Sequence, residues 1–204
     1  MRTLLDGDGP RGVRALAAEA AVGNASSSRV LNLLTRDDIV ERDVTGAVAA
    51  VRKRALARRW AQDYGLTTTN NSVSVLAPRG IDRLLTTLAR SQLRYALTGS
   101  AAARVYLPAG RVSVAPLALP VLFVPNATTA QDELEVLPAD RGANVLLVEP
   151  FDDVVYRGTT RFDGLQYVAA SQAVADLLTG PGRSSEEADQ LLDALAATDP
   201  AWAQ

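Results

Sequence analysis

Residues 93 to 107 read Leu-Arg-Tyr-Ala-Leu-Thr-Gly-Ser-Ala-Ala-Ala-Arg-Val-Tyr-Leu. Tyr95 to Leu97 carry side chains typical of a strand, whereas Ala101 to Ala103 begin a helix that Pro108 ends. A tight turn separates the two, and in it only Gly99 tolerates a positive φ. The stretch therefore predicts a strand that passes through a turn into a helix.

The turn Thr98-Gly99-Ser100 has two interpretations. Nucleotidyltransferases hold a triphosphate at a Gly-Ser turn of this kind, because N–H groups at a helix start suit an anion. The same residues also make an ordinary turn with a Ser cap. Nucleotidyl transfer needs paired carboxylates for Mg²⁺ on the next strand, yet Arg104 to Val124 contains no Asp or Glu, and the pair Glu133 and Glu135 lies beyond that strand. We therefore expect a scaffold without catalysis, metal or cofactor.

Composition limits the classes of protein that fit. The chain has 204 residues, 48% of them apolar, which suffices for one large or two small domains. It has no Cys and no His, which excludes disulfides, thiol nucleophiles, His-based triads and the usual zinc sites. No apolar run approaches the roughly 20 residues that span a bilayer. We expect a cytoplasmic protein with no membrane partner.

Charge is unevenly distributed along the chain. Residues 1 to 110 hold 16 Lys and Arg against 9 Asp and Glu, whereas residues 111 to 204 hold 5 against 14. The split suggests a front half that meets an anion such as nucleic acid and a rear half that meets a basic partner. The alternative is that the two halves neutralise each other.

The first 51 residues predict a helix-turn-helix followed by a hairpin. Arg2 to Asp6 predicts a short helix, and Val13, Leu16, Ala17 and Ala20 form the apolar stripe of a second that Gly23 ends. The next helix begins at a Ser cap, buries Val30, Leu33 and Leu34, and exposes Ser28, Arg29, Asn32 and Arg36. Residues 39–42 and 47–51 then predict two strands joined by a turn at 43–46, which is the order of a winged helix.

Arginine, asparagine and serine are the side chains that read base edges or bind phosphates. Five further cations open the helix that ends near Tyr64, and we expect them to follow phosphates. Both surfaces also fit a solvated helix face. The expected DNA-binding residues are Ser26, Ser27, Ser28, Arg29, Asn32, Arg36, Arg42, Arg52, Lys53, Arg54, Arg58 and Arg59.

The rest of the chain predicts a sheet between helices. Leu66 to Ser74 is polar and predicts an inter-domain connection, and Arg79 to Ala89 predicts a helix. Short apolar runs then predict strands at Val112–Ala115, Val121–Val124, Leu134–Leu137, Val145–Glu149, Val154–Tyr156 and Leu165–Val168. Two helices follow, Gln172 to Leu178 after a Ser171 cap and Ala188 to Ala197 after the capping box at Ser184 to Glu187.

Three phrases in this order resemble the AbiEi family, the antitoxins of type IV toxin-antitoxin pairs. They are Tyr-Ala-Leu-Thr-Gly-Ser-Ala-Ala-Ala at 95–103, Asn-Val-Leu-Leu-Val-Glu-Pro at 144–150, and Ser-Gln-Ala-Val-Ala-Asp-Leu-Leu-Thr-Gly-Pro-Gly-Arg at 171–183. The resemblance spans nearly the whole chain. It implies an α+β protein in which a winged helix-turn-helix domain, residues 1–65, precedes an α/β antitoxin domain, residues 66–204, whose sheet resembles a degenerate nucleotidyltransferase.

The family implies a transcriptional autorepressor that binds inverted repeats of double-stranded DNA in its own operon and opposes a nucleotidyltransferase toxin. Dimerisation on the operator is compatible with this expectation. The alternative function is a one-component, ligand-responsive repressor whose C-terminal domain senses a small molecule. An active nucleotidyltransferase would need Glu133 and Glu135 as metal ligands.

Overall fold

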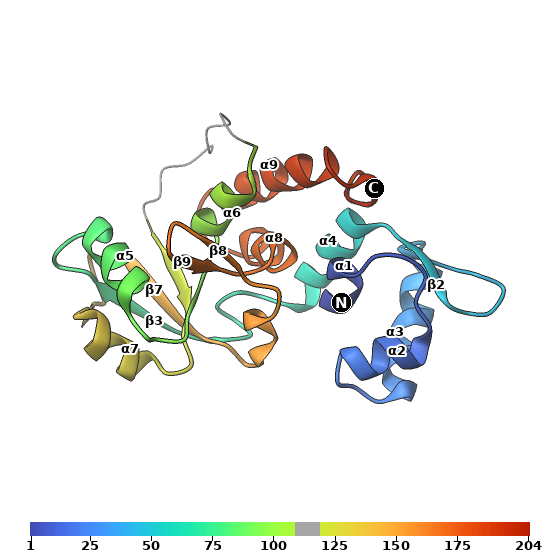
Figure 1. Ribbon diagram of the computed structural model, residues 1–204, viewed down its shortest axis with the longest axis horizontal. Helices are drawn as coiled ribbons and strands as arrows, with labels where there is room; N and C mark the ends of the chain where they lie inside the picture. Colours follow the sequence, from blue (N-terminus) through green and yellow to red (C-terminus); the bar gives the residue numbers. More distant parts are fainter. Residues whose placement is uncertain (109–118) are drawn as a thin grey trace. The chain divides into compact units, whose positions relative to one another are not determined.

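The computed structural model describes residues 1–108 and 119–204, and the chain divides into two compact units (Figure 1). The first unit comprises residues 1–63 and 192–204, and the second comprises residues 64–191. Helix α9 (Ser184–Ala196) crosses this division. The expected boundary at residue 65 placed the last 13 residues with the second part of the chain, whereas they pack with the first unit. The strand expected at Val112–Ala115 lies outside the described residues.

The first unit begins with three helices and a hairpin. Its elements are α1 (Arg2–Asp6), α2 (Val13–Glu19), α3 (Asn24–Arg36), β1 (Val40–Arg42), β2 (Val48–Val51), α4 (Lys53–Asp63) and the 3₁₀ helix η2 (Pro200–Trp202). Strands β1 and β2 are antiparallel, and Arg11 adds an isolated antiparallel bridge to Val48. The core is formed by leucines from all four α-helices, because each helix presents one apolar stripe: Leu4, Leu5, Leu16, Leu31, Leu34 and Leu56.

The turn between α2 and α3 differs in detail from the expectation. Ala21, at φ 54°, adopts the left-handed conformation that ends α2, and the N–H groups of Ala21 and Val22 donate to the carbonyls of Ala18 and Ala17. Gly23 instead precedes α3 as its N-cap, at φ −68°. Ala20 is exposed because α2 has already ended at Glu19.

The second unit is a seven-stranded mixed sheet with helices. Its strands are β3 (Asn71–Leu76), β4 (Ala96–Thr98), β5 (Val121–Phe123), β6 (Leu137–Pro138), β7 (Val145–Glu149), β8 (Thr160–Phe162) and β9 (Leu165–Tyr167). Its helices are α5 (Ile81–Arg90), α6 (Ser100–Tyr106), α7 (Ala127–Leu134), the 3₁₀ helix η1 (Asp153–Tyr156), α8 (Ala170–Leu178) and most of α9. The strand order is β6-β3-β7-β5-β4-β9-β8.

Helices cover both faces of this sheet. Helices α5 and α7 pack on one side, and α6 and α8 pack on the other (Figure 1). The central strands β4, β5 and β7 are buried almost throughout, which fits their continuous apolar sequences. Strands β5 and β7 are parallel, as are β4 and β9, while the other neighbours are antiparallel.

Two predicted strands differ from the structure. Of the strand predicted at Leu134–Leu137 only Leu137 lies in a strand, β6, whereas Leu134 is the last residue of α7, which begins after the cap at Asn126 and ends where Glu135 takes the left-handed conformation at φ 53°. Residues 154–156 form the 3₁₀ helix η1, with Asp152 accepting from the Val154 N–H. The expected connection at 66–74 contains most of β3, which pairs with β7 from Asn71 onward.

The predicted strands at 121–124, 145–149 and 165–168 are confirmed within one residue. The fold is therefore mixed α+β with a mixed sheet. Among the described residues, no helix is both long and apolar enough to cross a membrane.

Candidate nucleic-acid interface

Helix α3 presents a polar face to solvent. Arg29, Asn32 and Arg36 are all exposed and recur at three- and four-residue spacing, so they share one side of the helix. The buried side is formed by Ser27, Leu31 and Leu34. The expected exposed face is thus present. Of the expected apolar stripe, Leu34 is buried and Leu33 is half-buried, but Val30 is 39% exposed and Leu31 is buried in its place.

The three serines expected at the start of this helix lie in different environments. Helix α3 begins two residues earlier, at Asn24, so none of them is its N-cap. Ser27 is buried, Ser28 is half-buried, and Ser26 is exposed and accepts a hydrogen bond from Arg29 Nη2 at 3.3 Å. Ser26 therefore contacts the exposed arginine face directly.

The hairpin after α3 has a rigid turn. Asp43 Oδ1 accepts hydrogen bonds from the Thr45 N–H at 2.8 Å, the Thr45 hydroxyl at 2.6 Å and the Ala47 N–H at 3.0 Å. The hydrogen bond from the Thr45 side chain is the main reason that the pKa of Asp43 is lowered. At the tip, Val44 is completely exposed. The carboxylate therefore closes the turn and leaves an apolar side chain projecting from it.

Arg42 links the hairpin to α3. Its Nη1 donates to Asn32 Oδ1 at 2.9 Å, and its Nε donates to the Gly46 carbonyl at 2.8 Å. Sequence patterns gave no sign of this contact, because it joins residues on two elements ten positions apart. The first unit therefore brings Arg29, Asn32, Arg36 and Arg42 onto one surface formed by α3 and the hairpin.

The five cations near the start of α4 are not a free basic surface. Arg52 pairs with Glu41 at 3.5 Å, Arg54 pairs with Asp193 at 2.6 Å, and Arg59 pairs with Asp63 at 2.8 Å. Arg58 is exposed. Because Arg52, Arg54 and Arg59 are matched by carboxylates of the same unit, they are poorly suited to the phosphate contacts expected from sequence.

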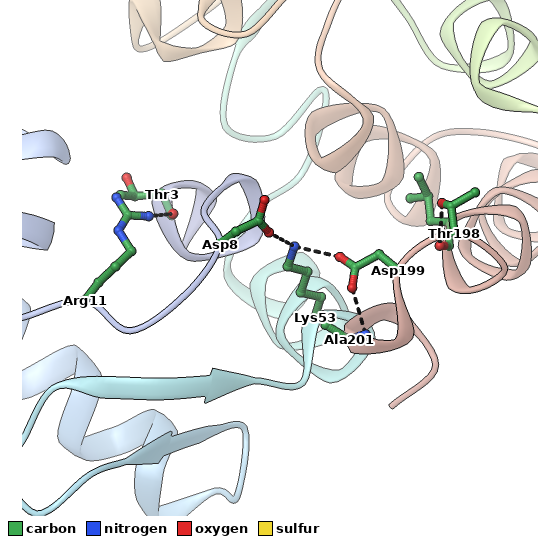
Figure 2. A network of polar contacts seen from close by, with 8 residues as sticks. Thr3, Asp8, Arg11, Lys53, Thr198, Asp199 and Ala201 are labelled. Atoms are coloured by element: carbon green, nitrogen blue, oxygen red, sulfur yellow. Dashed lines mark hydrogen bonds and ion pairs between the residues drawn. The ribbon is translucent and has the colours of Figure 1, made fainter.

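Lys53 departs most from the expectation, because it is a buried structural residue. Figure 2 shows its ammonium between two carboxylates, with Nζ 2.8 Å from Asp199 and 3.2 Å from Asp8. Its side chain is only 8% exposed. Asp199 also accepts a hydrogen bond from the Ala201 N–H at 2.9 Å, so the same carboxylate starts η2. These residues line a cleft of about 410 Å³ together with β2.

Burial disfavours the Lys53 ammonium, but its hydrogen bonds to Asp199 and Asp8 outweigh burial and raise the pKa of Lys53 above 10.5. Burial likewise opposes ionisation of Asp199, yet the hydrogen bonds from Lys53 and Ala201 lower the pKa of Asp199 below 3.8. The stabilisation is therefore present at neutral pH. It is lost as the pH falls through the lowered pKa of Asp199 and as it rises through the raised pKa of Lys53.

We expect Lys53→Met to destabilise the protein by about 1.5 to 3 kcal/mol at neutral pH, since two charge-assisted hydrogen bonds are lost while the side-chain volume is kept. Denaturant unfolding of both proteins across the pH range measures this. The difference should shrink in acid below about pH 3.8 as Asp199 is protonated. If Lys53 is structural, the salt dependence of any DNA binding should be the same for Lys53→Met and the wild type. A flatter salt dependence in Lys53→Met would instead indicate that Lys53 contacts a phosphate.

The charge split between sequence halves does not follow the two units. The first unit holds 11 Lys and Arg against 10 Asp and Glu, and the second holds 10 against 13. The net charges are +1 and −3, because five arginines of the front half belong to the second unit and two aspartates of the rear half belong to the first. The first unit as a whole therefore carries almost no net charge.

In the second unit, the Gly-Ser turn meets carboxylates. Gly99 has φ 60°, as expected, and Ser100 donates a hydrogen bond to Glu187, which is buried. With Asp176, these residues line a pocket of about 130 Å³. Helix α6 has only seven residues, and two buried carboxylates beside its start oppose a polyphosphate. Among the described residues, these two carboxylates therefore disfavour a bound polyphosphate at the turn.

Several acidic side chains of α9 are engaged within the protein. Glu187 is buried against Ser100, Glu186 pairs with Arg183 at 2.5 Å, and Asp193 pairs with Arg54. Leu191 and Leu192 form the buried side of the helix. The capping box is absent, since α9 already begins at Ser184 and Glu187 points to α6 instead.

No protein-family model, curated protein or solved structure matches this chain. Within residues 1–108 and 119–204, no cluster of three or more acidic residues could hold a metal ion. The assignment of function therefore depends on the geometry of the chain itself.

Proposed function

We propose that the first unit binds double-stranded DNA as a winged helix-turn-helix, with α3 in the major groove and the β1–β2 hairpin as its wing. The order of elements supports this class: a helix, a single bridge at Arg11, two helices joined by a short turn, and a hairpin. The second helix of such a pair is the one that reads base edges.

One observation carries the proposal. Arg29 and Arg36 are exposed on α3, and neither forms an ion pair with another described residue, whereas the cations of α4 are largely matched by carboxylates. An exposed arginine without a carboxylate partner retains its full capacity for guanine edges or phosphates. Asn32 lies between the two on the same face and supplies the amide that suits adenine.

The particular protein that fits these features best is a transcriptional autorepressor and antitoxin similar to the AbiEi family. The support is the sequence resemblance together with a first unit of helices and a hairpin and a separate second unit with a mixed sheet. On this proposal the second unit opposes a nucleotidyltransferase toxin and is not itself catalytic. The buried carboxylates beside the Gly-Ser turn agree with that role, because they disfavour a bound triphosphate.

The first test is DNA binding by the full chain. We expect it to bind the duplex upstream of its own gene more tightly than random duplex, with the binding constant falling as salt rises, at about 0.9 in logarithmic slope for each neutralised phosphate. Fluorescence anisotropy at several salt concentrations measures both. Equal affinity for the two duplexes would refute the proposal of a sequence-specific repressor.

The second test separates the two activities in the full chain. Cells expressing the adjacent gene product as toxin should be rescued by the wild type and also by a variant with Arg29→Ala and Arg36→Ala, which removes DNA reading but leaves the second unit intact. Rescue by the wild type alone would place neutralisation in DNA binding. Absence of rescue by both proteins would leave a DNA-binding repressor and exclude the antitoxin role.

One observation favours the alternative of a ligand-responsive repressor. The Ser184 hydroxyl lines the pocket at the Gly-Ser turn, is buried, and has no hydrogen-bond partner among the described residues. A small ligand with a polar group would satisfy it. Under this alternative Ser184→Ala would abolish a ligand-induced change in operator affinity, whereas the antitoxin proposal expects Ser184→Ala to leave both operator binding and rescue unchanged.

A further inference from the structure

The conformation of the β1–β2 hairpin directs the Arg42 side chain toward α3. The pairing of β1 with β2 shifts register between Glu41 and Arg42, where Ala49 of β2 has no partner in β1, and such a bulge changes the direction of the side chains beside it. The turn itself is closed by Asp43 and by Gly46, whose φ of 82° favours glycine. The direction of the Arg42 side chain is therefore set by the backbone of the hairpin.

The Arg42 guanidinium is anchored on both sides. Its Nε donates to the Gly46 carbonyl, and its Nη1 donates to Asn32 Oδ1. A Cβ atom added to Gly46 would lie 3.4 Å from Arg42 Nη2, which is ordinary contact, so glycine is favoured here by its φ of 82° and not by the space that the guanidinium needs. Arg42 is half-buried, which limits the other positions that it can take.

This contact decides how the Asn32 amide is oriented. An asparagine amide has an acceptor oxygen and a donor NH₂, and a flip exchanges them. Because Arg42 offers only N–H donors, the flipped amide would place donor against donor. Asn32 Oδ1 therefore stays toward Arg42 with one lone pair remaining, and Nδ2 is held in a fixed direction. This is the arrangement that reads adenine, since Nδ2 donates to N7 while Oδ1 accepts from N6.

We propose that Arg42 is a specificity-determining positioning residue, which acts through Asn32 by fixing its amide for adenine and does not itself contact a base. The proposal rests on the proposed function and deepens it. Because the Asn32 amide is already fixed before DNA binds, little side-chain entropy is lost on binding. The preference for adenine therefore depends on Arg42, although Arg42 contacts only protein atoms.

The test is a double-mutant cycle with Asn32→Ala, Arg42→Ala and the double variant. A duplex site is selected from random sequence by the wild-type protein, and the adenines of that site are then replaced one at a time. Asn32→Ala should lose roughly 5- to 150-fold preference at one adenine, the amount that a bidentate base contact supplies. Arg42→Ala should lose preference at the same adenine, and the double variant should lose no more than Asn32→Ala.

Arg42→Lys is the matched control for Arg42→Ala. It keeps the positive charge but lacks the planar guanidinium that donates hydrogen bonds to both Gly46 and Asn32. It should lose the adenine preference while keeping the salt slope of the wild type. If Arg42 instead contacts a phosphate, Arg42→Ala weakens selected and random duplex alike and flattens the slope by about 0.9, which overturns the proposal. Additive losses in the cycle overturn it as well.

A measurement on the DNA-free protein distinguishes failure of this inference from failure of the proposed function. The side-chain NH₂ signals of Asn32 in a ¹H–¹⁵N spectrum should shift in Arg42→Lys, and their relaxation should report a more mobile amide. If they do so while the wild type selects no DNA sequence, the proposed function fails and the contact stands. If they are unchanged, the contact does not orient Asn32, whatever the DNA does.

Discussion

Replacing both Arg29 and Arg36 with Ala is expected to weaken operator binding by about 2 to 6 kcal/mol, because each bidentate arginine contact contributes about 1 to 3 kcal/mol. The two side chains are seven residues apart on α3, or about 10 Å along the axis, so their effects should add. Both are exposed, which means that folding should be unaffected. Anisotropy titrations of each single variant and of the double variant measure the losses.

Helix α5 offers a matched control for this pair. Arg83 and Arg90 are exposed, lie seven residues apart on one helix, and belong to the second unit. Arg83→Ala with Arg90→Ala removes the same charge with the same spacing, and it should leave operator affinity within a few-fold of the wild type. Equal losses in the two double variants would mean that net charge, and not the α3 face, determines binding.

Replacing Asp176 with Ala is expected to give the largest loss of stability. This carboxylate is 1% exposed and accepts hydrogen bonds from the Tyr64 hydroxyl at 2.6 Å, the Thr98 hydroxyl at 2.5 Å and Gln172 Nε2 at 2.9 Å. Burial and the nearby carboxylate raise the pKa of Tyr64, so its hydroxyl remains a donor. Ala would leave three buried donors without this acceptor, which should cost about 3 to 5 kcal/mol.

Calorimetry should record this change as a fall of about 6 to 20 °C in the melting temperature of the second unit. Tyr64→Phe removes only one of the three donors and should cost about 1 to 2 kcal/mol, because Asp176 keeps its bonds to Thr98 and Gln172. A loss as large for Tyr64→Phe as for Asp176→Ala would contradict this account. So would a stability of Asp176→Ala equal to the wild type.

The local sequence was sufficient to predict those elements whose conformation is determined by residues close to them in the chain. The stripe containing Leu16 and Ala17 predicted α2, and the order of polar residues at 43–46 predicted the hairpin turn. The turn before α6 followed from Gly99, because only glycine takes φ 60° without strain. In each case the physical cause lies within a few residues, namely helical periodicity or backbone conformation.

Elements that depend on distant partners were not predictable in the same way. Asn71 and Ser72 look like a loop, and they form a strand only because β7 offers its edge. The apolar run from Leu134 has the pattern of a strand, yet Leu134 is the last residue of helix α7, which begins at the cap Asn126. Periodicity cannot decide between these outcomes for runs of four residues.

The candidate site divides along the same line. Sequence alone determined that α3 would expose Arg29, Asn32 and Arg36, since helical spacing places them on one side. Only the tertiary structure decided which cationic side chains remain available to contact DNA. Lys53 is held by Asp199, 146 residues away, and Arg42 reaches Asn32 across two elements, because ion pairs and hydrogen bonds depend on distance in space and not on distance along the chain.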